Sequence, residues 1–65
     1  MKTKRHRNKI RGFRLEAGKR QLDLARKLNV YQSEISQIER GERVPGVYFA
    51  KRIAKALGRT IEEIF

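Results

Sequence analysis

Residues 21–41 of the chain read QLDLARKLNVYQSEISQIERG, and this stretch divides into two short helical patterns. Apolar side chains recur three and four residues apart in each half, which is the spacing of one face of an α-helix. These side chains are Leu24, Ala25, Leu28, Ile35 and Ile38. Between the halves, Asn29 tolerates the left-handed backbone that ends a helix. The stretch therefore predicts two helices, near 21–28 and from about Gln32, joined at a tight corner.

The outer face of the second predicted helix is polar and mostly uncharged. With Ile35 and Ile38 turned inward, the side chains left on the outer side are Gln32, Ser33, Ser36, Gln37 and Arg40. Amides and hydroxyls suit the base edges of the DNA major groove, where Gln pairs with adenine and Ser with several bases. A face that is simply solvated is the alternative, although such faces more often carry Glu and Lys at i,i+4 spacing.

The rest of the sequence predicts three more helices, and hence an all-α, five-helix domain. Asn8 and Gly18 bracket the first helix, Gly58 ends the fourth, and Thr60 with Glu63 forms a capping box for a short last helix. Two apolar stripes mark the first and fourth helices: Ile10, Phe13 and Ala17, then Val47, Ala50, Ile53, Ala54 and Leu57.

Positive charge is concentrated at the start of the chain. Seventeen Lys and Arg against seven Asp and Glu give a net charge of +10, and the first 20 residues hold nine of the cations and one acid. This predicts a flexible basic arm at residues 1–7 ahead of a single domain at residues 8–65. The arm either lies along nucleic-acid phosphate or is only a solubilising tail, and the basic character of the whole chain favours phosphate.

The composition argues against an enzyme and against a metal or cofactor site. The chain has no Cys and one His, so a thiol nucleophile, a Ser-His-Asp relay or a His-based metal site cannot be assembled within one chain. The longest apolar run, residues 47–50, is far short of the roughly 20 residues that span a bilayer. We expect an intracellular, cytoplasmic protein, associated with the nucleoid when bound to DNA, without membrane contact.

The stretch from Gln21 to Gly41 resembles the helix-turn-helix of the lambda-repressor/Cro-like family, also called XRE-type. The similarity includes Ile38-Glu39-Arg40-Gly41 with Pro45 soon after, and it extends to Ile61-Glu62-Glu63-Ile64-Phe65. It covers about residues 8–65, with the helix-turn-helix itself at about 21–40. The resemblance implies a five-helix domain that binds double-stranded operator DNA, usually as a homodimer on a pseudo-palindromic site.

The resemblance also assigns roles to individual residues. It implies base reading by the polar residues of the second motif helix: Gln32, Ser33, Ser36 and Gln37. It implies DNA-backbone contacts for Arg40 and Arg43, and for Gln21, which lies at the positively polarised N-terminus of the first motif helix. Arg14 and Glu39 match a partly buried ion pair, so the Glu39 carboxylate is expected to be structural rather than catalytic.

Several positions depart from the family pattern, and three of them bear on contacts with the DNA backbone. Lys19 and Arg20 stand where relatives usually have an apolar residue and a Ser or Thr cap, which costs the helix a cap worth about 1 kcal/mol. Phosphate would relieve the two cations, so we expect them at the DNA backbone. Tyr31 replaces a small cap, and it either covers a phosphate or packs against the corner.

Two surfaces are candidates for protein contacts. By resemblance, a dimer surface would include Gly58, Arg59, Ile61 and Phe65. Four large side chains fall outside the predicted core stripes: Leu15, Leu22, Tyr48 and Phe49. The favoured function is a sequence-specific, DNA-binding transcriptional repressor. The alternatives are an antitoxin or adaptor-type interaction module with an unknown protein partner, and the DNA-binding fragment of a larger regulator.

Overall fold

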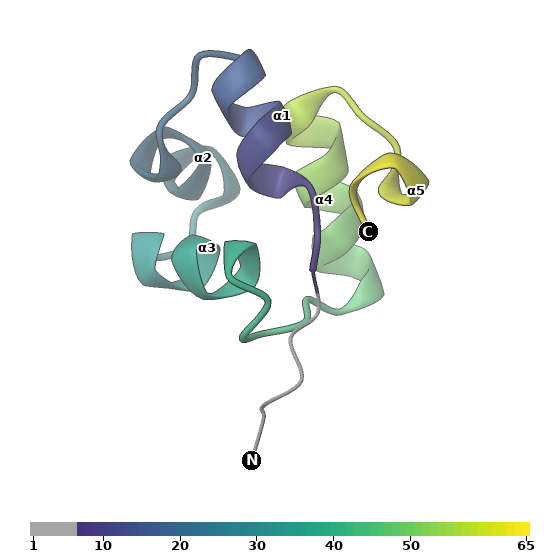
Figure 1. Cartoon of the computed structure of the whole chain (residues 1–65). Helices are drawn as coiled ribbons and strands as arrows, with labels where there is room; N and C mark the ends of the chain where they lie inside the picture. Colours follow the sequence, from purple (N-terminus) through teal and green to yellow (C-terminus); the bar gives the residue numbers. More distant parts are fainter. Residues whose placement is uncertain (1–6) are drawn as a thin grey trace.

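A computed structural model describes residues 7–65, which contain five α-helices. They are α1 (Ile10–Glu16), α2 (Gln21–Leu28), α3 (Gln32–Glu39), α4 (Val47–Leu57) and α5 (Ile61–Ile64). In the view of Figure 1, α2 and α3 lie on one side, α4 and α5 on the other, and α1 between them. The predicted all-α, five-helix fold is confirmed. The predicted basic arm lies outside the described residues, except for Arg7.

Left-handed residues end the helices where the sequence predicts them. Asn29 follows α2 with φ +60° and Gly58 follows α4 with φ +68°. Glycine adopts this conformation without the steric penalty that a Cβ brings, and Asn is the side chain that tolerates it best. The turn at Asn29 lets a connection of only three residues join α2 to α3, and the two helices pack closely against each other.

Side chains near the helix starts satisfy free backbone N–H groups. Thr60 and Glu63 form the predicted capping box, in which the Thr60 Oγ1 accepts from the Glu63 N–H at 3.2 Å and Glu63 Oε1 accepts from the Thr60 N–H at 2.8 Å. Asn8 Oδ1 accepts from the Ile10 N–H at 3.1 Å, although Lys9 rather than Asn8 is the first capping residue of α1. Asn8 was predicted to be the N-cap of α1, but it accepts this hydrogen bond from the position before the N-cap.

Most apolar residues predicted from helical spacing lie in the core. Two predicted core residues are exposed instead, and one residue predicted outside the core packs against it. The side chains of Ile10, Leu24, Ile35, Ile38, Ile53 and Ile64 are almost fully buried. Val47, the first residue of α4, is 72% exposed, although Ala50 in the same turn is buried. Ala17, in the turn after α1, is also exposed. Phe49 was expected outside the core but packs against it half-buried.

The fourth helix is fixed to the end of α2 by a side chain. Arg52 Nη2 donates a hydrogen bond of 2.9 Å to the Leu28 carbonyl, one of the last carbonyls of α2 that has no helical partner. No helix in the described part of the chain is both long enough and apolar enough to cross a membrane.

We predict that Ile53→Ala lowers the free energy of unfolding by about 2–5 kcal/mol, because it removes a fully buried side chain and leaves a cavity. The matched control Val47→Ala, in the same helix, should change it by less than about 0.5 kcal/mol. Urea unfolding followed by circular dichroism measures both. Similar losses for the two variants would contradict this description of the core.

Candidate nucleic-acid interface

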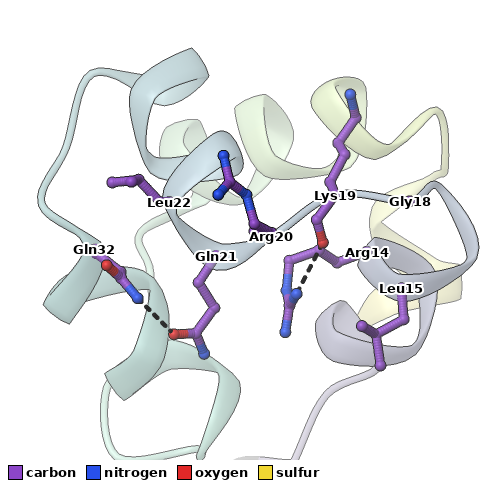
Figure 2. A pocket seen from close by; sticks show the side chains of 8 residues that line it. All are labelled: Arg14, Leu15, Gly18, Lys19, Arg20, Gln21, Leu22 and Gln32. Carbon is purple, nitrogen blue, oxygen red and sulfur yellow. Dashed lines mark hydrogen bonds between the residues drawn. The ribbon is translucent and has the colours of Figure 1, made fainter.

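The first residues of α2 and α3 meet at one edge of the molecule. Gln32 Nε2 donates a hydrogen bond of 3.3 Å to Gln21 Oε1, as Figure 2 shows. Gln32 and Ser33 are exposed, and Ser36 and Gln37 are half-buried one turn further along α3. Of the four residues predicted to read bases, the structure therefore places Gln32 in direct contact with the N-terminus of α2, and the other three follow it along α3.

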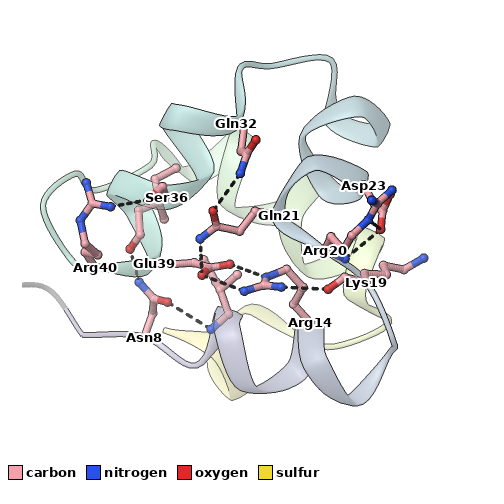
Figure 3. A network of polar contacts seen from close by, with 12 residues as sticks. Asn8, Arg14, Lys19, Arg20, Gln21, Asp23, Gln32, Ser36, Glu39 and Arg40 are labelled. Carbon is pink, nitrogen blue, oxygen red and sulfur yellow. Dashed lines mark hydrogen bonds and ion pairs between the residues drawn. The ribbon is translucent and has the colours of Figure 1, made fainter.

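A buried ion pair lies behind Gln21. Arg14 Nε donates to Glu39 Oε2 at 2.6 Å and Arg14 Nη2 to Glu39 Oε1 at 3.2 Å, with the two side chains 7% and 3% exposed. Gln21 Nε2 donates to the same Glu39 Oε1 at 3.0 Å. Figure 3 shows the resulting chain of hydrogen bonds from Gln32 through Gln21 and Glu39 to Arg14. The surface amide of Gln32 is thus connected to the interior by side chains of three helices.

The ion pair is completely hydrogen-bonded. The remaining Arg14 nitrogen, Nη1, donates to the Lys19 carbonyl at 2.9 Å and so fixes the connection between α1 and α2. Asn8 Nδ2 donates to the Ile38 carbonyl at 2.7 Å and joins the start of α1 to the end of α3. Among the described residues, no buried side-chain nitrogen or oxygen lacks a partner. Hydrogen bonds to every charged group offset the cost of removing the two charges from water.

A shallow pocket opens in front of this network. Figure 2 shows its lining, which consists of Arg14, Leu15, Gly18, Lys19, Arg20, Gln21, Leu22 and Gln32. The pocket brings Lys19 and Arg20 together with Gln21 at the start of α2. Leu15 is exposed and Leu22 half-buried at its rim. Two of the large side chains outside the predicted stripes therefore lie beside the polar residues of the candidate interface.

Arg20 has a carboxylate partner that the sequence analysis did not identify. Asp23 Oδ1 accepts from Arg20 Nη2 at 3.0 Å, and Asp23 Oδ2 accepts from Arg20 Nε at 3.1 Å and from the Arg20 backbone N–H at 2.8 Å. Hydrogen bonds from the Arg20 guanidinium and then from its backbone lower the pKa of Asp23 to about 2. Asp23 therefore caps the start of α2 and compensates one of the two cations there. The i,i+3 spacing was the available signal.

The two loop arginines are also paired with carboxylates. Arg40 donates to Glu42 from Nε at 2.9 Å and from Nη2 at 3.0 Å, and its Nη1 donates to Ser36 Oγ. These hydrogen bonds to the Glu42 carboxylate raise the pKa of Arg40. Arg43 Nη1 lies 3.9 Å from Glu34 Oε2, so Glu34 in α3 faces a cation.

Tyr31 does not pack against the corner between α2 and α3. It precedes α3, makes no side-chain capping hydrogen bond, and is 79% exposed. Its ring is therefore available at the surface beside the start of α3.

Comparisons with known proteins identify the family to which this arrangement of helices belongs. Residues 10–64 match a family described as "Helix-turn-helix". The chain belongs to this family. An HTH-type transcriptional regulator of Methanothermobacter thermautotrophicus is 44% identical over 57 residues, which are 86% of this chain and 83% of the relative. The resemblance to XRE/Cro-like proteins is thus confirmed, and the chain is a non-enzymatic, DNA-binding helix-turn-helix transcriptional regulator.

Two solved structures of regulators share the fold. The clp gene regulator ClgR from Corynebacterium glutamicum has a TM-score of 0.77 and 26% identity over 82% of this chain. The biofilm master regulator SinR, in complex with DNA, has a TM-score of 0.76 and 29% identity over 83% of this chain. The helix-turn-helix chain spans 56% of that ClgR chain and 87% of that SinR chain.

The residues assigned by resemblance to a dimer surface of this helix-turn-helix protein have different environments. The Arg59 guanidinium stacks 4.4 Å from the centre of the Phe13 ring and lies 3.3 Å from Glu16 and 3.6 Å from Glu63. Ile61 packs half-buried against the core, whereas Phe65 is exposed. Arg59 therefore connects α1 with α5 within one chain. Among the described residues, no group of three or more His, Cys, Asp or Glu is placed to hold a metal ion.

We predict that Glu39→Ala lowers the free energy of unfolding by about 3–5 kcal/mol, because it leaves the buried Arg14 charge without its partner. The double variant Arg14→Met, Glu39→Leu should recover most of this loss, since no unpaired charge remains. Thermal and urea unfolding of the three proteins compare the two changes. If Glu39→Ala is as stable as the parent, the pair is not buried as described.

Proposed function

We propose that this regulator is a sequence-specific repressor that reads the major groove of double-stranded DNA with α3. The hydrogen-bonded chain from Gln32 to Arg14 supports this proposal most strongly. A flexible Gln side chain must be ordered before it can form two hydrogen bonds to one adenine, and a partner that orders it in advance reduces the entropy lost on binding. The Gln21 amide supplies such a partner, and Glu39 in turn fixes Gln21.

The proposed contacts divide into two groups. Gln32, Ser33, Ser36 and Gln37 read base edges. The DNA backbone is bound by Lys19, Arg20, Gln21, Tyr31, Arg40 and Arg43. Backbone contacts give affinity that falls as salt rises, because Lys and Arg displace counterions from phosphate. Base contacts add discrimination, about 1–3 kcal/mol for each good bidentate pair.

The N-terminal basic residues add to the backbone contacts in this proposal. We assign residues 8–65 to the DNA-binding domain and residues 1–7 to an arm that follows the phosphate backbone. The high net charge of +10 is consistent with a partner that is a polyanion. Repression follows when the bound protein occupies a promoter and excludes polymerase.

We further propose that two copies bind together on a pseudo-palindromic operator. Half-sites of such a dimer are centred about 34 Å apart, which is one turn of DNA. Of the predicted dimer surface, Gly58, Arg59 and Phe65 are exposed and Ile61 is half-buried, so the exposed ring of Phe65 is its apolar part available to a second copy.

Selection of bound sequences from a random duplex pool, at about the physiological 150 mM salt, tests this proposal. We expect a motif with two related half-sites, and sedimentation should show two protein chains on the selected duplex. Recovery of no motif would contradict sequence-specific reading. A motif bound by a single chain would contradict the dimer but leave the reading helix intact.

Two substitutions separate base reading from backbone binding. Gln32→Ala should weaken binding to the selected site by about 1–3 kcal/mol and leave random DNA nearly unaffected, because only a base contact is lost. Arg43→Ala should weaken both and reduce the salt slope by about 1, because it removes one phosphate contact. Fluorescence anisotropy titrations at several salt concentrations measure these effects. An equal loss on both DNAs for Gln32→Ala would refute its assignment to base reading.

A further inference from the structure

Each of the three arginines assigned to the DNA backbone has a carboxylate partner within the chain. The pairs are Arg20 with Asp23, Arg40 with Glu42, and Arg43 with Glu34. The three acids make up half of the six acidic residues after position 20. A cationic face built only for phosphate would not place an acid against each arginine, so these acids require their own explanation.

We propose that Asp23, Glu34 and Glu42 compete with DNA phosphate for these arginines and thereby limit the affinity of the protein for DNA. We call these three residues the competitor acids. The inference rests on the proposed function, because it takes the arginines as phosphate contacts. It adds that in the free protein the donors of Arg20 and Arg40 are already occupied by intramolecular carboxylates, and that Arg43 faces one at 3.9 Å without a hydrogen bond, so DNA must displace these acids.

The Arg40–Glu42 pair shows the competition most directly. Arg40 engages both carboxylate oxygens of Glu42 with two of its nitrogens, at 2.9 and 3.0 Å. This fork-to-fork arrangement is the one in which Arg also binds a phosphate group. A phosphate that binds this Nε–Nη2 edge needs the same two donors, so it can take the edge only when Glu42 leaves it.

Release of Arg40 has a second consequence. Arg40 Nη1 donates to the hydroxyl of Ser36, which is one of the proposed base-reading side chains. When Arg40 turns to phosphate, the Ser36 hydroxyl loses this donor and is free to bond a base. Because Arg40 bonds both Glu42 and Ser36, its release from Glu42 links a backbone contact to a base contact.

The Arg20–Asp23 pair lies on the other side of the reading residues. Figure 3 shows Asp23 and Arg20 on one side of Gln32 and Gln21, with Arg40 and Ser36 on the other. The guanidinium of Arg20 holds the pKa of Asp23 at about 2, so this acid stays ionised throughout the pH range of a DNA-binding measurement. Arg20 with its acid Asp23 and Arg40 with its acid Glu42 therefore lie on opposite sides of Gln32 and Gln21 in this view.

The exposure of these pairs makes exchange possible. The arginine side chains are between 51% and 75% exposed. Ion pairs of this kind are weak enough that removing one acid should change binding by about 2- to 5-fold. Phosphate, which is fixed in a dense array along DNA, can displace them. Three such exchanges together would alter affinity by an order of magnitude or more, if they act independently.

Glu42→Gln in the full chain is the decisive variant, with Glu62→Gln as its matched control. Both substitutions remove one negative charge, but Glu62 is an exposed residue of α5 and is paired with none of these arginines. Glu42→Gln should bind random duplex DNA about 2- to 5-fold more tightly than the control. Its plot of log affinity against log salt should be steeper by up to about 0.9, because one more arginine is available to phosphate.

A double-mutant cycle with Arg40→Gln tests whether the acid acts through its arginine. In the Arg40→Gln background, Glu42→Gln should raise affinity no more than Glu62→Gln does. Circular dichroism melts of each variant report whether the fold is retained. A merely structural role for Glu42 would alter the melting temperature but would leave the salt slope unchanged.

The results separate this inference from the proposed function. If Arg40→Gln weakens DNA binding but Glu42→Gln matches the control, the competition is refuted and the backbone assignment stands. If Arg40→Gln leaves binding unchanged, the backbone assignment is wrong and the inference falls with it. An increase for Glu42→Gln that persists in the Arg40→Gln background would show a general charge effect and also refute the competition.

Discussion

The arrangement of the candidate interface depends on one buried interaction, the ion pair between Arg14 and Glu39. Its two residues come from α1 and from the end of α3, and Arg14 also holds the carbonyl before α2. Three helices therefore converge on a single guanidinium–carboxylate unit. A buried ion pair adds little net stability compared with apolar residues of the same volume, but its directional hydrogen bonds impose one geometry. Here that geometry extends through Gln21 to the surface.

The surface around this unit balances opposite charges over short distances. The pairs of Arg20 with Asp23 and of Arg40 with Glu42 reduce repulsion locally on a chain with a net charge of +10. The same pairs order side chains that would otherwise be mobile. Stability of the free protein and readiness for a polyanion thus make conflicting demands on the same residues.

Much of this structure was predictable from the sequence, because helical periodicity and helix-ending residues agree with the fold. The core positions Leu24, Ile35 and Ile53 follow from spacing alone. The exposure of Val47 did not, because periodicity indicates a direction around the helix axis but not whether a neighbouring element covers that residue. Asp23 stands at i,i+3 from Arg20, a spacing that could have identified it, but Glu42 was missed for a reason related to that for Val47. Which of several nearby acids an arginine selects depends on rotamers and loop geometry, which spacing does not determine.

The hydrogen bond from Asn8 to the Ile38 carbonyl has a consequence for the start of the chain. It fixes residue 8 beside the last turn of α3, and the Lys9 N–H is bound in turn to the Ile64 carbonyl at 2.9 Å. Two successive residues ahead of α1 are therefore tied to the last residues of α3 and α5, so the start of α1 can move away from the rest of the domain only if these two hydrogen bonds break.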